Sequence, residues 1–147
     1  MQAAGGVRDH PQGPGRSGNA VATAAVLASI DELASGEIYE RVGQVGTALM
    51  QSIRSCAAAT MPGLHVQGLP MAFHASFAAS SQPMTRYNQL QRSGPGRYER
   101  LASTFIEQGV WVARRGIWYV SAAHTDADVT ETVDRIESAF KIFNVAR

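Results

Sequence analysis

A single long apolar stripe over residues 37–59 limits the folds that this chain can adopt. Apolar side chains recur there at spacings of four, three, four and four residues: Ile38, Val42, Val45, Leu49 and Ile53. Such spacing lines the side chains up along one face of an α-helix. A helix of this kind owes its stability to the elements that cover its apolar face. The sequence therefore predicts a helix over 37–59, ended by Met61-Pro62-Gly63, inside a packed domain.

Three further segments have helical patterns. Residues 17–34 begin with a good N-cap, Ser17 or Asn19, and continue as an Ala-rich helix to about Leu33. A helix ending near Gly109 carries three large side chains on one side, namely Tyr98, Leu101 and Phe105. The last segment has apolar residues at spacings of four, three and four: Val129, Val133, Ile136 and Phe140. We expect an amphipathic terminal helix.

Other stretches have the alternation of β-strands. Apolar residues alternate with small or polar ones between 71 and 78, and the apolar set is Met71, Phe73, Ala75 and Phe77. The sequences VWVA (110–113) and IWYVSA (117–122) predict two short strands joined by Arg114-Arg115-Gly116, whereas 80–95 is expected to be a loop. This order of elements predicts an α+β fold, in which helices cover one face of a short antiparallel or mixed sheet.

Length, charge and cysteine content narrow the class of protein. A chain of 147 residues corresponds to one domain. We predict a flexible arm or loop over residues 1–16, which are rich in Gly and Pro, and one domain over 17–147. The net charge of +1 argues against a nucleic-acid-binding surface. No apolar run reaches the roughly 18 residues of a membrane-spanning helix, and the single Cys56 favours a reducing, cytoplasmic setting.

The stretch WYVSAAHTDADV, residues 118–129, gathers one imidazole, two carboxylates and two aliphatic hydroxyls. Thr125 precedes the terminal helix and Asp128 follows three residues later, which is the spacing of a capping box. The alternative is a metal site formed by His124, Asp126 and Asp128. Positions 126 and 128 point in different directions on a helix, and no second histidine is close in sequence. The pattern therefore favours a helix cap, with His124 as an acid or base left open.

Three stretches together carry a family resemblance. SGNAVATAAVLASIDEL is similar to a Ser-Gly-Asn-Pro segment and its following helix, and VQGLPMAFHASF is similar to a Gly-x-Gly-Ser-Met-Phe strand. FIEQGVWVARRGIWYVSAAHTDADVTETVDRIESAF is similar to a final helix–strand–strand–helix. Over residues 13–143 the chain thus resembles the C-terminal part of class III aminotransferases, pyridoxal-phosphate enzymes of fold type I, and most closely the glutamate-1-semialdehyde aminomutase branch. The resemblance implies their small C-terminal domain, preceded by a long interdomain helix.

The resemblance also implies an activity and its partners. The family transfers amino groups on an amino acid, keto acid or semialdehyde with pyridoxal phosphate, and a dimer or other homo-oligomer is expected. Its Schiff-base lysine lies in the large domain, upstream of the Ser-Gly-Asn segment. Lys141 is the only lysine here, in the terminal helix, and the resemblance gives it no cofactor role. The chain is therefore expected to be a C-terminal fragment, or a truncated or split gene product, without catalytic residues of its own. Its expected partner is a large domain or second subunit.

Residues near the start are the candidate cofactor contacts. A threonine of the family, two residues before Ser-Gly-Asn, binds the cofactor phosphate of the partner subunit, and Gly15 stands at that position. The resemblance thus implies cofactor binding by Gly15, Arg16 and Ser17, whose backbone N–H groups would face a phosphate. A substrate-binding arginine of many family members is replaced by Trp118. Arg114 and Arg115, just upstream, are alternative carboxylate ligands, although a charged turn is the simpler interpretation.

Two other functions stay open. A decayed aminotransferase domain could persist as a non-catalytic α+β binding module. Alternatively, His74, His124 or Cys56 could serve an unrelated enzyme, although packing roles for these residues are the simpler interpretation. No Ser-His-Asp order, phosphate-binding Gly loop or Cys/His metal spacing supports that second alternative.

Overall fold

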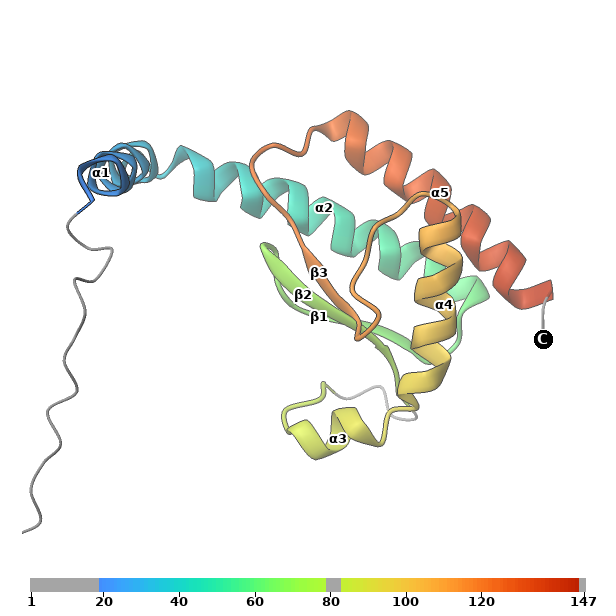
Figure 1. The fold of residues 1–147 in the computed structure, drawn as a ribbon. Coiled ribbons are helices and arrows are strands. Elements are labelled where there is room, and N and C mark those ends of the chain that lie inside the picture. Colours follow the sequence, from blue (N-terminus) through green and yellow to red (C-terminus); the bar gives the residue numbers. More distant parts are fainter. Residues whose placement is uncertain (1–18, 79–82, 146–147) are drawn as a thin grey trace, which may run out of the picture. The chain divides into compact units, whose positions relative to one another are not determined.

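The computed structural model describes residues 19–78 and 83–145, in two compact units that divide after Gly36. The described part of the first unit is helix α1, Ala20–Ala34 (Figure 1). Asn19 caps this helix, because its side-chain oxygen accepts hydrogen bonds from the backbone N–H groups of Val21 and Ala22 at 2.9 and 3.4 Å. The helix was predicted, and Asn19 is its cap; Ser17 lies outside the described residues, as does the predicted boundary at 16.

Helix α1 buries none of its side chains. Its large apolar residues are all more than one third exposed: Val21, Val26, Leu27, Ile30 and Leu33. Three of them, Val26, Ile30 and Leu33, lie at spacings of four and three, and so share one face of the helix.

The second unit is built on a three-stranded antiparallel sheet of order β1-β2-β3. The strands are β1 (Leu64–Leu69), β2 (Ala72–Phe77) and β3 (Ile117–Tyr119). Strands β1 and β2 form a hairpin in which Leu69 pairs with Ala72, so that Pro70 and Met71 make the turn. Strand β3 pairs with β2 through Phe73 and Trp118. The predicted α+β fold is confirmed.

Three long helices pack around this sheet. They are α2 (Glu37–Thr60), α4 (Pro95–Glu107) and α5 (Asp126–Val145). Helix α2 contacts β1 and α5, and α4 contacts β2 and α5. Figure 1 shows α2 and α5 on one side of the sheet, and the short helix α3 (Tyr87–Gln91) on the other. The helix predicted over 37–59 is confirmed, and its stripe meets the stripe of the terminal helix.

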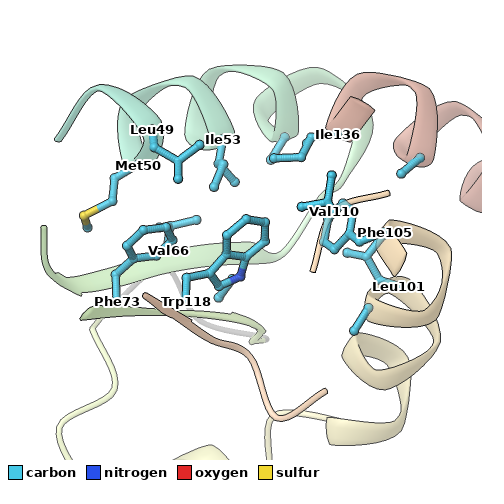
Figure 2. Close-up of a cluster of buried hydrophobic side chains, with 14 of the residues drawn as sticks. Leu49, Met50, Ile53, Val66, Phe73, Leu101, Phe105, Val110, Trp118 and Ile136 are labelled. Atoms are coloured by element: carbon cyan, nitrogen blue, oxygen red, sulfur yellow. The ribbon is translucent and has the colours of Figure 1, made fainter. Parts of the chain in front are cut away.

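The shared core is aromatic at its centre (Figure 2). The ring of Trp118 stacks on that of Phe73, with centroids 5.6 Å apart, and meets the edge of Phe105 at the same distance. Offset stacks and edge contacts of this kind add about 0.5–1.5 kcal/mol each to the burial itself. The largest fully buried side chains come from the sheet and from the helices that cover it: Phe73, Phe105, Phe140, Ile53, Met61, Leu101 and Ile136.

Three expectations about local structure are wrong. Residues 110–113 form no strand, although burial alternates from buried Val110 to Trp111, which is 89% exposed. The N–H of Val110 instead closes on the carbonyl of Phe105 at 2.8 Å, and none of the three strands pairs with this segment. The predicted loop at 80–95 contains helix α3, which is too short to show an apolar period. Met71 also leaves the predicted apolar face, because it lies in the hairpin turn.

Candidate functional site

A pocket of about 610 Å³ lies against the sheet, beside α3. Because Phe73, Ala75 and Phe77 of β2 belong to the core, the alternate residues His74 and Ser76 point to the opposite face of the sheet. The walls come from four separate parts of the second unit: strand β2, helix α3, the start of helix α4, and the turn that leads into β3. The volume falls in the usual range for small-molecule sites, about 300–1,000 Å³.

The segment that carries α3 is held over the sheet by one glutamine. The side-chain amide of Gln67 on β1 donates to the carbonyl of Met84 at 2.8 Å, and its oxygen accepts from the N–H of Met84 at 2.9 Å. Gln67 pairs with His74 across the two strands, so both side chains lie on the same face. This pair of hydrogen bonds resembles the backbone pairing of two adjacent strands. It holds the segment that follows, in which Tyr87, Leu90 and Gln91 form one wall of the pocket.

Two of the residues that line the pocket are buried and carry hydroxyl groups. Ser76 is 4% exposed, and its Oγ has no hydrogen-bond partner among the residues that the structure describes. Tyr98 is 3% exposed, and its hydroxyl oxygen accepts a 2.8 Å hydrogen bond from Nε1 of Trp118. Burial raises the pKa of Tyr98, so that its hydroxyl keeps its proton at neutral pH. Both groups therefore remain able to donate.

The turn at Arg114–Gly116 forms the charged rim. The ring nitrogen Nε2 of His74 lies 2.9 Å from the carbonyl of Arg115, and the N–H of Ala75 donates to the carbonyl of Gly116 at 2.8 Å. Gly116 has a φ of +91°, and a Cβ on it would collide with the carbonyl of Ala75. The turn is thus locked onto β2 only because this residue is glycine. Arg114 and Arg115 both line the pocket.

The rim carries more positive than negative charge. Nη1 of Arg114 lies 3.9 Å from Oε1 of Glu99, and both side chains are more than half exposed. Arg115 has no acidic partner within the described part of the chain. One arginine charge is therefore offset at the rim and the other is free to act on a ligand.

The stretch at 121–128 is a helix cap, as predicted. The carboxylate of Asp128 accepts from the N–H of Thr125 at 2.7 Å and from its hydroxyl at 2.8 Å, while the N–H of Asp128 donates back to Thr125 at 3.2 Å. These bonds from Thr125, helped by His124, lower the pKa of Asp128. Asp126 pairs instead with Arg41 at 3.2 Å. Among the residues that the structure describes, no cluster of three metal-ligating side chains occurs.

The remaining candidates lie on separate elements. Gly15, Arg16 and Ser17 are outside the described residues. Trp118 fills the core, and Lys141 is exposed on α5. Cys56 on α2 is half-buried and its thiol donates to Glu137 at 3.4 Å. Burial, followed by this hydrogen bond and the charge of Glu137, raises the pKa of the thiol.

Sequence reasoning missed the two hydroxyls of the pocket. Tyr98 sits in the apolar stripe of its helix and was counted as core, and Ser76 sits on the small and polar face of its strand. A serine beside a histidine on the polar face of a strand was the only local signal for the pocket. Helix α3, which the sequence did not predict, supplies part of the wall of this pocket.

None of the helices in the described part of the chain combines the length and apolarity that crossing a bilayer requires.

Comparison with known proteins gives a sequence relative. The chain is 31% identical to glutamate-1-semialdehyde 2,1-aminomutase of Albidiferax ferrireducens over 130 residues, which are 87% of this chain and 29% of that protein. The chain therefore spans less than a third of the curated relative's length. No family model matches the chain.

Solved structures show the same fold. A transaminase from directed evolution by ancestral reconstruction superposes with a TM-score of 0.67, at 23% identity, over 93% of this chain and 30% of that one. The FumI protein of Sphingopyxis sp. MTA144, in its pyridoxal-phosphate internal aldimine form, gives a TM-score of 0.58 at 24% identity, over 71% and 22% of the two chains. The resemblance to the C-terminal part of pyridoxal-phosphate aminotransferases and aminomutases is confirmed.

Proposed function

Because this chain is similar in sequence and in fold to the C-terminal part of pyridoxal-phosphate aminotransferases and aminomutases, we propose that it supplies the small domain of such an enzyme. The reaction would be amino-group transfer on an amino acid, keto acid or semialdehyde. The cofactor, when bound, acts as the electron sink of that chemistry. The observation that carries the proposal is the sequence match to the aminomutase over 87% of this chain.

The described residues do not fit a covalent anchor for the cofactor. Lys141 is the only lysine of the chain, and it is exposed on α5 and does not line the pocket. The phosphate contacts proposed from the resemblance, Gly15, Arg16 and Ser17, precede α1. We therefore expect no transamination by the isolated chain. Its role would be to close part of the active site of a large domain or second subunit.

Helix α1 supports a partner of that kind. A helix that buries none of its side chains, but carries Val26, Leu27 and Ile30 more than half exposed, leaves apolar surface for another chain to cover. We propose that this surface packs on the large domain or on a second copy, in a dimer or larger homo-oligomer. The single cysteine of the chain agrees with a cytoplasmic setting.

Cofactor trapping tests the catalytic part of the proposal. Pyridoxal phosphate is titrated into the pure 147-residue chain, reduced with borohydride and located by peptide mapping. We expect no saturable adduct, in the wild type or in the Lys141→Arg control. A stoichiometric adduct at Lys141 that the control abolishes would show that the chain has built a cofactor site of its own, and would overturn the proposal.

Sedimentation tests the partner. We expect the wild-type chain to self-associate, and the double variant Leu27→Gln/Ile30→Gln to shift toward monomer. A wild-type chain that stays monomeric and unfolds in one sharp transition would instead favour the non-catalytic binding module.

A further inference from the structure

We propose that helix α1 of one copy of this chain docks on the outer face of the sheet in a second copy. The outer face is the side of the sheet that points away from the core. The proposal deepens the role given to α1 above, and it rests on the proposed function in one respect, namely that the chain forms homo-oligomers. It adds the receiving face and the charges that select it.

One row of side chains on the outer face is exposed. Leu69, Ala72 and Tyr119 pair directly across the three strands. They share the outer face, because the neighbouring pair of Phe73 and Trp118 belongs to the core. Leu69 is 65% exposed and Tyr119 is 72% exposed. The row therefore presents an apolar strip at the hairpin end of the sheet.

The pocket beside α3 continues this strip. His74 and Ile117 are the next pair along the same face, two residues from Ala72 and Tyr119, and both line the pocket. The opposite wall of the pocket includes Tyr87 on α3, which is 74% exposed. The strip and the pocket together form a mostly apolar trough. An amphipathic helix docks in a groove of this kind through side chains at spacings of three and four residues.

The stretch that borders the trough is basic. Residues 83–118 contain six arginines and only two glutamates, a net charge of +4, whereas the whole chain has +1. Arg114 and Arg115 line the pocket and are exposed. Glu99 offsets Arg114 only, through an exposed pair at 3.9 Å, and Arg115 has no acidic partner within the described residues. The rim of the trough thus attracts negative charge.

Helix α1 has the complementary character. Its apolar residues Val26, Leu27 and Ile30 are all more than half exposed. Its only charged residues are Asp31 and Glu32, near its C-terminal end, and no basic residue lies in its last turn. The negative end of the helix dipole adds to these two carboxylates. An apolar helix with a negative end therefore matches an apolar trough with a positive rim.

A second copy supplies both halves of the contact. Each copy carries one α1 and one trough, so a two-fold dimer fills both troughs at once. The area buried is then twice that of a single docked helix. Complementary charges across such an interface fix its register and exclude wrong partners.

Charge reversal in the full chain tests the docking, with dimerisation followed by sedimentation equilibrium. Arg114→Glu/Arg115→Glu should weaken dimerisation by about tenfold or more, because like charges then face each other. Asp31→Arg/Glu32→Arg should weaken it by a similar factor. The chain with all four substitutions keeps the net charge of wild type and should dimerise within about threefold of it.

Two further variants separate the contact from general effects. Arg100→Glu/Lys141→Glu makes the same change in net charge at exposed residues outside the pocket, and should alter dimerisation by less than about threefold. Tyr119→Gln removes an exposed ring from the strip and should weaken dimerisation by about fivefold or more. This variant keeps the test decisive if the charge-reversed chains do not fold.

The possible outcomes separate this docking from the proposed function. The docking is wrong if the fourfold variant stays as weak as its two parents, or if Arg114→Glu/Arg115→Glu and Tyr119→Gln both dimerise like wild type. In the second case α1 packs on another surface, and the role as a small domain stands. A monomeric wild-type chain would overturn the docking and the proposed homo-oligomer together, whereas the cofactor-trapping result would still decide the catalytic part.

Discussion

The indole Nε1 of Trp118 lies 2.8 Å from the hydroxyl of Tyr98 and donates to it, inside the core. This bond joins strand β3 to helix α4, whose Phe105 also packs against Trp118. The two residues are 20 positions apart in sequence, and each is more than nine-tenths buried.

Replacing Tyr98 by Phe leaves the buried indole N–H without an acceptor. We expect the free energy of unfolding to fall by about 1–3 kcal/mol, measured by urea denaturation at pH 7. The matched control is Tyr119→Phe, whose ring is 72% exposed and whose substitution should change stability by less than about 0.5 kcal/mol. Equal losses in the two variants would show that the bond is not the cause.

The same tyrosine gives a dependence on alkaline pH. Burial raises the pKa of Tyr98 above its ordinary value, whereas in the unfolded chain it titrates near 10. The folded state therefore holds the proton over a pH range in which the unfolded state releases it, so stability should fall as pH rises above about 10. The slope of unfolding free energy against pH should be smaller in Tyr98→Phe than in wild type. Parallel slopes would contradict the assignment.

Alanine substitutions at two glycines one turn apart on α2 should change the stability of the fold in opposite directions. A Cβ on Gly46 would collide with the backbone carbonyl of Pro70 in the β1–β2 turn, whereas a Cβ on Gly43 meets nothing within 4 Å. We expect Gly46→Ala to destabilise by about 1–3 kcal/mol through overpacking, and Gly43→Ala to stabilise by about 0.5–1 kcal/mol through helix propensity. The measurement is the change in melting temperature of each variant relative to wild type. A change of the same sign in both variants would refute the contact between Gly46 and Pro70.

The cap of α5 should lose its effect in acid. The pKa of Asp128 in the folded chain is lowered, chiefly by the hydrogen bond from the N–H of Thr125. The carboxylate therefore stabilises the fold at pH values above its unfolded pKa of about 3.9. This stabilisation is lost as the pH falls through the pKa of the folded state. Asp128→Ala should lower the melting temperature at pH 7 and approach wild type near pH 2. Asp134→Ala, in the middle of the same helix, is the control. A difference that persists unchanged in acid would rule out the charged cap.

Gln67 is expected to hold the α3 wall in place. Its amide makes both hydrogen bonds to the backbone of Met84. In Gln67→Ala, amide hydrogen exchange across 84–91 should accelerate by about tenfold or more, since two bonds are lost, while exchange in α2 stays as in wild type. Gln51→Ala on the exposed face of α2 is the matched control. Unchanged exchange at 84–91 would mean that other contacts fix this segment.

The apolar periods were sufficient to predict the long helices, because each of α2, α4 and α5 presents one stripe to a common core. The same reasoning failed at 110–113. Alternating burial is a property of side chains, and Val110 and Trp111 have it without a neighbouring strand to complete a ladder. A pattern within one segment does not contain its pairing partner.

The pocket was beyond sequence reasoning for a related reason. Ser76 and Tyr98 are 22 positions apart, and the wall that α3 forms beside them is held by Gln67 of strand β1. Each residue taken alone has an ordinary interpretation, as a strand serine or a core aromatic. Only the packing of β2 against α3 and α4 brings the two residues to the wall of one pocket.

The close fit of Gly46 against Pro70 has a consequence for how the domain assembles. Helix α2 and the hairpin that touches it are contiguous in the chain, from Glu37 to Phe77, so their contacts close short loops and form at little entropic cost. Helix α5 completes the same core from a position some 80 residues further on, as the bond from Asn144 to Thr60 illustrates. We expect the helix and hairpin to be the nucleus of folding and the docking of α5 to be the late step.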